Sequence, residues 1–166
     1  MNVRTPVTRA VASIVLAAAV LTGSAGCTFF ATQATLIQYD PSNGVGATVG
    51  DVKVRNAIAL ISDDGKAVSL LVTLVNTGRK DVSVTLQYES GGEKRTDLKA
   101  VAGGEAASFG NVVGEDQIIV LNPGVEAGAL FPVYVQYGEF EGKQLMVPVL
   151  EATGTYEELK PEDVLR

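Results

Sequence analysis

Short hydrophobic runs separated by turn residues fill residues 50–153 and predict an all-β domain. The segment 82–88 alternates strictly between apolar and polar residues, as expected of a strand with one buried face. The segment 68–75 is the most continuously apolar piece, which predicts a central strand. Further strands are expected at 52–61, 106–109, 117–121, 130–137 and 144–150. About seven strands of this kind predict an antiparallel two-sheet sandwich, with immunoglobulin-like or cupredoxin-like topology equally open.

The segments between these runs predict the turns and the ends of the domain. Asp63-Asp64-Gly65 predicts a hairpin turn, and the polar segment 89–98 predicts a long loop with Gly91-Gly92 at its tip. Pro148 cannot donate to a strand ladder, so it should lie on an edge strand or point outward. The acidic tail, 154–166, is expected to form one short helix or none.

The first 26 residues have the layout of a secretory signal peptide. Arg4 and Arg9 precede an apolar run over 10–21, and a stretch of small residues then leads to Cys27. The run has about 12 residues, whereas about 20 are needed to cross a bilayer as a helix. We therefore expect residues 1–26 to be removed.

Ala25-Gly26-Cys27 resembles a lipobox, although Ser24 stands where such motifs usually have an aliphatic residue. The resemblance implies cleavage between Gly26 and Cys27 and acylation of Cys27 with diacylglycerol and palmitate. Two acyl chains give stable membrane residence, where one gives only marginal binding. Residues 27–49 then form the lipidated N-terminus and a tether. The alternative is an ordinary secreted protein, in which Cys27 stays a thiol.

Charge excludes several partners. Without residues 1–26 the chain has 11 basic and 19 acidic residues, a net charge of −8. A domain of this sign repels phosphate backbones and anionic headgroups, so we expect no nucleic-acid partner. Contact with the membrane is expected only through the lipid anchor at Cys27.

Candidate catalytic chemistry is sparse. The chain has no His, so the commonest general base and the orienting residue of a triad are absent. Acylation of Cys27 would remove the one thiol, and no cofactor motif is present, because Gly65-Lys66 and Gly142-Lys143 lack the phosphate-loop pattern. Asp63-Asp64-Gly65 lacks the ligand series of a calcium loop. We expect no enzyme, no catalytic residue and no cofactor.

Two other groups of residues have a structural and a functional interpretation. The carboxylate pairs of the loops and tail are interpreted as solvated surface rather than acid–base groups; they are Glu115-Asp116, Glu157-Glu158 and Glu162-Asp163. Four aromatic residues, Tyr88, Tyr134, Tyr137 and Phe140, would suit a ligand face, but core or cross-strand packing is the favoured interpretation.

From Val54 onward the order of segments resembles the PCu(A)C copper-chaperone family and its actinobacterial lipoprotein relatives of the LpqE type. The residues that carry the resemblance are Leu70–Gly78, Val101–Glu105, Pro123–Gly128 and Val147–Val149, with Val49–Val52 and Arg55-Asn56 resembling the lipoproteins. The resemblance implies a cupredoxin-like sandwich. Copper-binding members hold Cu(I) with His and Met, whereas Met146 is the single Met after residue 26 and is interpreted as core filler. No metal ligand can be carried over.

These inferences favour a lipoprotein of the cell membrane that faces the extracytoplasmic side and binds another envelope component, expected to be a protein. The alternative is a degenerate copper-chaperone-like metal carrier. A glycosidase working with two carboxylates is a third class, disfavoured because the small sandwich leaves little room for a cleft. The ligand-binding residues are unknown from the sequence.

Overall fold

The structure is a computed structural model that describes residues 8, 10–19, 42–112 and 116–161. It divides into two units, Met1–Tyr39 and Asp40–Arg166. In the first unit residues 10–19 are helical, and no helix among the described residues is long and apolar enough to cross a membrane. Gly26 and Cys27, together with most of the expected tether, lie outside the described residues.

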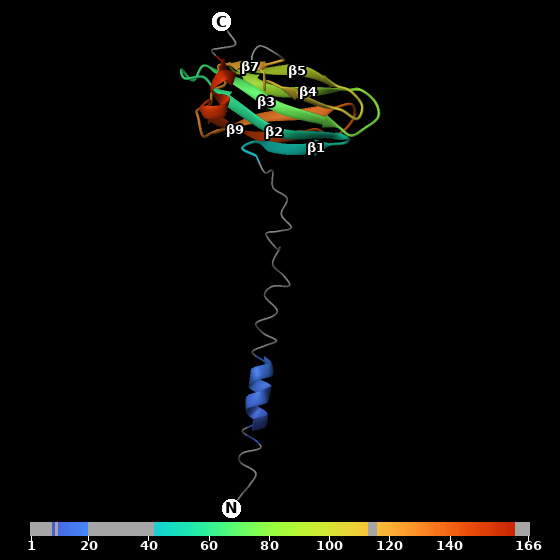
Figure 1. The fold of residues 1–166 in the computed structure, drawn as a ribbon, viewed down its shortest axis with the longest axis vertical. Coiled ribbons are helices and arrows are strands. Elements are labelled where there is room, and N and C mark those ends of the chain that lie inside the picture. The colour runs from blue at the N-terminus through green and yellow to red at the C-terminus, as the bar shows by residue number, and fades with distance from the viewer. Residues whose placement is uncertain (1–7, 9, 20–41, 113–115, 162–166) are drawn as a thin grey trace, which may run out of the picture. The chain divides into compact units, whose positions relative to one another are not determined.

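The described part of the second unit consists of β-strands followed by a short 3₁₀ helix (Figure 1). The strands are β1 (Val45–Val49), β2 (Val52–Ile61), β3 (Ala67–Asn76), β4 (Val82–Ser90), β5 (Glu93–Val101), β6 (Ala106–Phe109), β7 (Ile118–Leu121), β8 (Leu130–Tyr137) and β9 (Lys143–Glu151). The 3₁₀ helix η2 spans Gly154–Leu159. The all-β prediction is confirmed.

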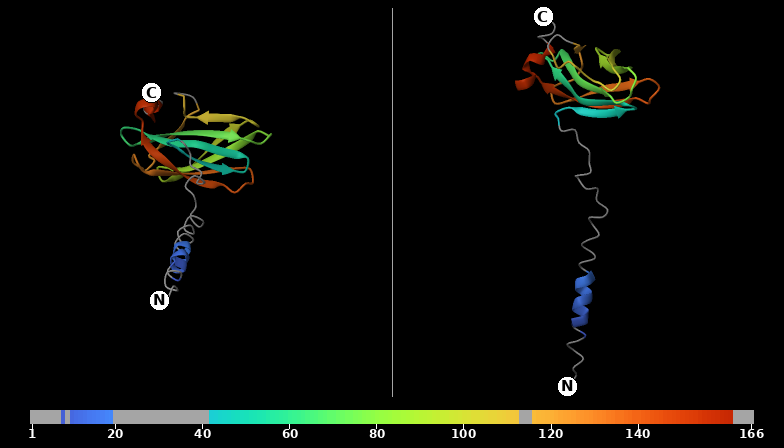
Figure 2. Two further views of the ribbon diagram at one scale, coloured as in Figure 1. Left: turned by 60° about the horizontal axis from the view of Figure 1, so that its bottom comes forward. Right: turned by 45° about the vertical axis from the view of Figure 1, so that its right-hand side comes forward.

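The strands form one sheet, and Figure 2 shows its curl from two sides. The strand order is β5-β4-β8-β9-β2-β3-β6, with β1 paired to β2 and β7 paired to β3. We call β5, β4, β8 and the first part of β9 the β4 half, and β1, β2, β3, β6 and β7 the β3 half. Strand β9 joins them, because Lys143–Pro148 pairs with β8 and Val149–Glu151 pairs with β2. The β2–β9 pairing is parallel, which departs from the purely antiparallel sandwich that we expected.

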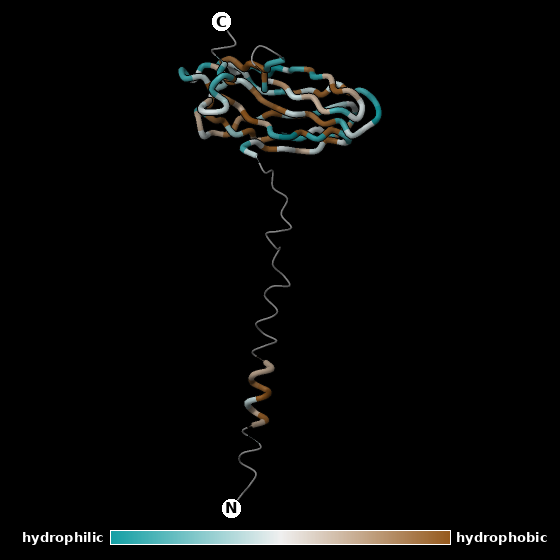
Figure 3. Tube along the Cα trace, in the orientation of Figure 1, coloured by the Kyte–Doolittle hydropathy of each residue, from teal (hydrophilic) through white to brown (hydrophobic). Residues whose placement is uncertain are grey.

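The main core lies between the two halves. It includes Leu70 and Leu74 of β3, Leu86 of β4 and Phe131 of β8, all essentially inaccessible to solvent. The predicted alternation of 82–88 is confirmed, since Val84, Leu86 and Tyr88 are buried and the residues between them are not. The hydropathy colouring in Figure 3 follows this arrangement, with β3 predominantly hydrophobic.

A smaller cluster covers the opposite side of the β3 half. Ile58, Leu60 and Leu71 are buried there under Tyr156 and Leu159 of η2. In the described part of the tail, 154–161, η2 agrees with the expected short helix, and it shields apolar residues of β2 and β3 from water.

Three expectations about elements were wrong. Val45–Val49, assigned to the tether, is strand β1 and pairs with β2. The expected loop 89–98 is mostly the strand β5, and only Gly91-Gly92 forms the turn. Met146, expected in the core, is 45% exposed on β9. Pro148 was expected to lie on an edge strand or to point outward. It points outward, because its neighbours Val147 and Val149 are buried and side chains alternate along a strand.

Candidate functional site

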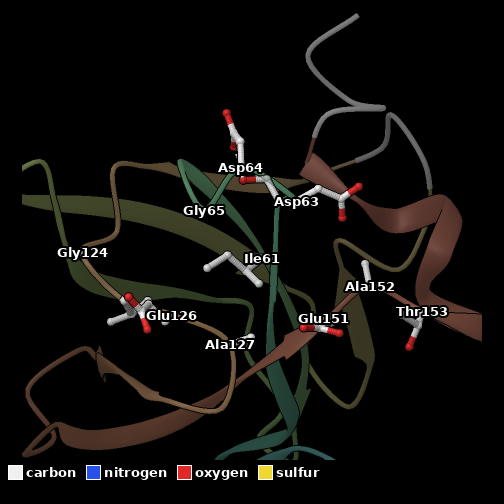
Figure 4. A pocket seen from close by; sticks show the side chains of 12 residues that line it. Ile61, Asp63, Asp64, Gly65, Gly124, Glu126, Ala127, Glu151, Ala152 and Thr153 are labelled. Carbon is white, nitrogen blue, oxygen red and sulfur yellow. Dashed lines mark hydrogen bonds between the residues drawn. The ribbon is translucent and has the colours of Figure 1, made fainter.

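One end of the domain carries an acidic hollow. The β2–β3 turn, the segment before β8 and the end of β9 line a cavity of about 650 Å³. Four carboxylates line it: Asp63 and Asp64 come from the β2–β3 turn, and Glu126 and Glu151 come from two other segments (Figure 4).

The two aspartates of this end have structural partners. Asp64 Oδ1 accepts hydrogen bonds from Ser62 Oγ (2.8 Å) and from the backbone N–H of Lys66 (3.0 Å), and its Oδ2 lies 3.0 Å from Lys66 Nζ. The backbone N–H of Lys66, followed by the Ser62 hydroxyl, lowers the pKa of Asp64 from 3.8 to about 2. Asp63 forms an ion pair with Lys160. The predicted hairpin turn is confirmed, and these contacts account for its charges.

The described residues were compared with the donor sets that bind metal ions. No group of three or more His, Cys, Asp or Glu residues there is placed to hold a metal ion. Met146, a soft donor, lies exposed on β9, where its sulfur accepts only a weak contact from Gln144 Nε2 at 3.8 Å. Soft copper sites need several thioether or imidazole donors, which the surroundings of Met146 do not supply.

The outer surface of the β4 half is a different kind of surface, because it is almost uncharged. The pairing registers place Ser83, Thr85 and Gln87 of β4 opposite Ala100, Leu98 and Thr96 of β5, and they place Pro132, Tyr134 and Gln136 of β8 opposite Met146, Gln144 and Thr85. Among the outward strand positions of this half, only Glu89 and Lys94 are charged. We call this surface the outer β4 face.

The charges of β5 point the other way. Tyr88 of β4, on the core side, donates a short hydrogen bond to Asp97, and the Lys99 ammonium lies 5.0 Å from the centre of the Phe109 ring. Burial and the bond to Asp97 raise the pKa of Tyr88. Because Asp97 and Lys99 occupy core-side positions, the outward positions between and beside them hold Thr96, the exposed Leu98 and Ala100.

Tyr134 lies near the centre of the outer β4 face. Its register partners are Gln87 on β4 and Gln144 on β9. A Cβ on Gly142 would come within 2.6 Å of the ring atoms of Tyr134, so the phenol end rests directly on the glycine backbone. Tyr134 as a whole residue is 36% exposed, and it lines a hollow of about 420 Å³ together with Gln87 and Gln144.

The other aromatic candidates have structural roles. Tyr88 and Tyr137 are buried, and the Tyr137 hydroxyl accepts the backbone N–H of Asp51 at 2.7 Å. Phe140 packs against the Tyr137 ring with the centroids 4.9 Å apart. The four aromatic residues therefore do not form one ligand face, and only Tyr134 belongs to the outer β4 face.

The remaining candidates from the sequence are spread over the chain. Gly65-Lys66 and Gly142-Lys143 lie in or beside turns, Glu157-Glu158 lies exposed in η2, and Glu162-Asp163 lies outside the described residues. Sequence reasoning did not single out Gln87, Gln144, Leu130 or Pro132. The period-two pattern of 82–88 and 130–137 is the signal that places Gln87, Leu130 and Pro132 outward.

No family model and no curated protein matches the chain. Several solved structures that resemble the chain are PCuAC domains. The apo PCuAC domain from PmoF1 is 14% identical with a TM-score of 0.54, and the match covers 66% of this chain and 100% of that one. The copper-bound PCuAC domain from PmoF2 has a TM-score of 0.48 at 10% identity, covering 66% and 99%, and the apo PmoF2 domain has 0.45 at 10%, covering 64% and 94%. The match to the PmoF1 domain, which has the highest TM-score of the three, shows that the strand domain of this chain has a PCuAC-like fold.

Proposed function

We propose that this chain is an extracytoplasmic lipoprotein, held at the membrane by acylated Cys27, whose sandwich binds another component of the cell envelope without catalysing a reaction. The observation that carries the proposal is the outer β4 face. It exposes large hydrophobic side chains, namely Leu98, Leu130, Tyr134 and Met146, and grouped exposed apolar residues commonly mark interaction sites. The envelope protein expected from the sequence is one candidate for the bound component.

Two features of the outer β4 face support binding. Leu130 is 52% exposed and Met146 is 45% exposed, and the two residues lie on adjacent paired strands beside Pro132. Burial of apolar area drives association at about 25 cal/mol per Å² before its costs are subtracted. The face is also part of a regular sheet, so its side chains need little reordering when a ligand binds.

A pair of matched substitutions tests the proposal. Leu130→Glu adds a charge to the outer β4 face, and Leu121→Glu adds one to a residue of nearly equal exposure (50%) at the end of β7. In-cell crosslinking of the full chain, followed by mass spectrometry, should capture an envelope component that Leu130→Glu loses and Leu121→Glu retains. Equal capture by both variants would overturn the assignment of this face.

The anchor has its own test. In Cys27→Ser no acyl chain can be attached, so the chain should leave the membrane fraction and lose the crosslinked component. Retention of Cys27→Ser in washed membranes would contradict the lipid anchor while leaving the outer β4 face open to the first test.

A further inference from the structure

We infer that the hollow around Tyr134 binds a neutral saccharide, so that the envelope component is a glycan. This inference rests on the proposed function, because it names the ligand class of the outer β4 face. The hollow of about 420 Å³ falls within the size range of small-ligand sites. It is lined by Gln87, Tyr88, Glu89, Lys94, Pro132, Tyr134 and Gln144.

The aromatic ring is held in place before any ligand arrives. Tyr134 packs its phenol end on Gly142, where any larger residue would collide with the ring. Aromatic rings offer a rigid apolar surface with a polar tip, which suits the C–H faces and hydroxyls of a sugar ring. A fixed ring also loses little conformational entropy on binding.

Two amide side chains flank the ring. Gln87 and Gln144 are the direct register partners of Tyr134 on the neighbouring strands, and both are exposed. Each amide offers two donors and one acceptor, the combination that pairs with hydroxyl groups, which both donate and accept. The 3.8 Å contact of Gln144 Nε2 with the Met146 sulfur is weak, so a sugar hydroxyl would replace it at little cost.

The charges around the hollow indicate an uncharged ligand. Glu89 and Lys94 are direct partners across the β4–β5 ladder, so the two opposite charges at the rim cancel. An anionic or cationic ligand would meet one repulsive partner for each attractive one. A ring flanked by amides in a hollow also differs from a flat apolar patch, which favours a saccharide over a protein as the occupant of this site.

The test uses the full chain in detergent micelles, titrated with short neutral oligosaccharides of glucose, galactose and mannose, and with a uronic acid oligomer as the charged comparison. Calorimetry and NMR should show binding of at least one neutral oligomer, with shifts of the side-chain amides of Gln87 and Gln144. Tyr134→Ala should weaken this binding about tenfold, whereas Tyr134→Phe keeps the ring and should change it by less than about threefold.

The outcomes separate the two proposals. If no neutral oligomer binds, or if Tyr134→Ala binds as the unsubstituted chain does, the saccharide inference is wrong. Capture of an envelope protein that depends on Leu130, without any saccharide binding, would overturn this inference and leave the proposed function standing. If neither a Leu130-dependent envelope component nor a bound saccharide were found, both proposals would be contradicted.

Discussion

At the scale of single residues, Asn76 shows how a turn residue becomes part of the core. Its Nδ2 donates to the carbonyls of Lys80 (2.7 Å) and Val101 (3.3 Å), and its Oδ1 accepts the N–H of Gly78 (2.9 Å). The side chain is buried, so it links the end of β3 to the β3–β4 turn and to the end of β5 away from competing water.

Replacement of Asn76 should therefore be costly. We expect Asn76→Leu to lower the free energy of unfolding by about 3 kcal/mol, because it leaves buried backbone groups without partners. Chemical denaturation measures this, with Thr77→Val as the control, since the Thr77 hydroxyl bonds to the Asp51 carbonyl at an exposed site. Equal losses in the two variants would mean that Asn76 does not hold the segments together.

Tyr88 links stability to alkaline pH. Burial raises its pKa above the ordinary value, and the hydrogen bond to Asp97 raises it further. A group whose pKa is raised by folding contributes stability that is fully present below about pH 10 and is lost as the pH rises toward the folded-state pKa.

Tyr88→Phe isolates this contribution. At neutral pH it should cost about 1 kcal/mol, the typical value of one partly accessible hydrogen bond. Above about pH 10, urea denaturation should show a smaller decline in stability for Tyr88→Phe than for the unsubstituted chain. Parallel declines would assign the alkaline sensitivity to another group.

At the scale of elements, the β2–β3 turn carries the acid-sensitive group. The pKa of Asp64 is lowered to about 2, so its stabilising contacts are fully present above about pH 4 and are lost as the pH falls through about 2. NMR titration of the Asp64 carboxyl carbon should give a midpoint near 2, and the Lys66 amide should shift with it. A midpoint near 3.8 would show that the turn is open in solution.

The strands that could be predicted are those whose pattern follows from their own burial. Over residues 82–88 of β4 the alternation is visible because each inward residue is apolar and each outward residue is polar. In β5 the pattern fails, because Arg95, Asp97 and Lys99 occupy core-side positions at the edge of the sheet. Their partners, such as Tyr88 and Phe109, come from other strands, and no local pattern can reveal such contacts.

The candidate site could be predicted only in part, because contacts between different strands leave no local sequence pattern. The outward direction of Tyr134 follows from the period of 130–137, but its neighbours Gln87 and Gln144 depend on the pairing of β8 with β4 and β9. Met146 was assigned to the core because Met usually fills apolar gaps. It is exposed because no described element covers the outer β4 face at that position.

At the scale of the whole molecule, the strand domain has a PCuAC-like fold, but its described residues offer Met146 as a soft metal donor without a partner of that kind. Titration of the full chain with Cu(I) against a competing chelator should show no stoichiometric site, since Met146 has no second soft donor among the described residues around it. One tightly held copper per chain would return the metal-carrier alternative to first place.

The sharing of β9 between the two halves decides how this domain can be divided. The strand leaves β8 after Pro148 and immediately begins pairing with β2, so neither half is a complete module by itself. New chain ends, as in a circular permutant, should therefore be placed in an exposed hairpin turn such as Gly91-Gly92. A cut at the boundary between the halves would instead leave each fragment with an open, unpaired strand edge.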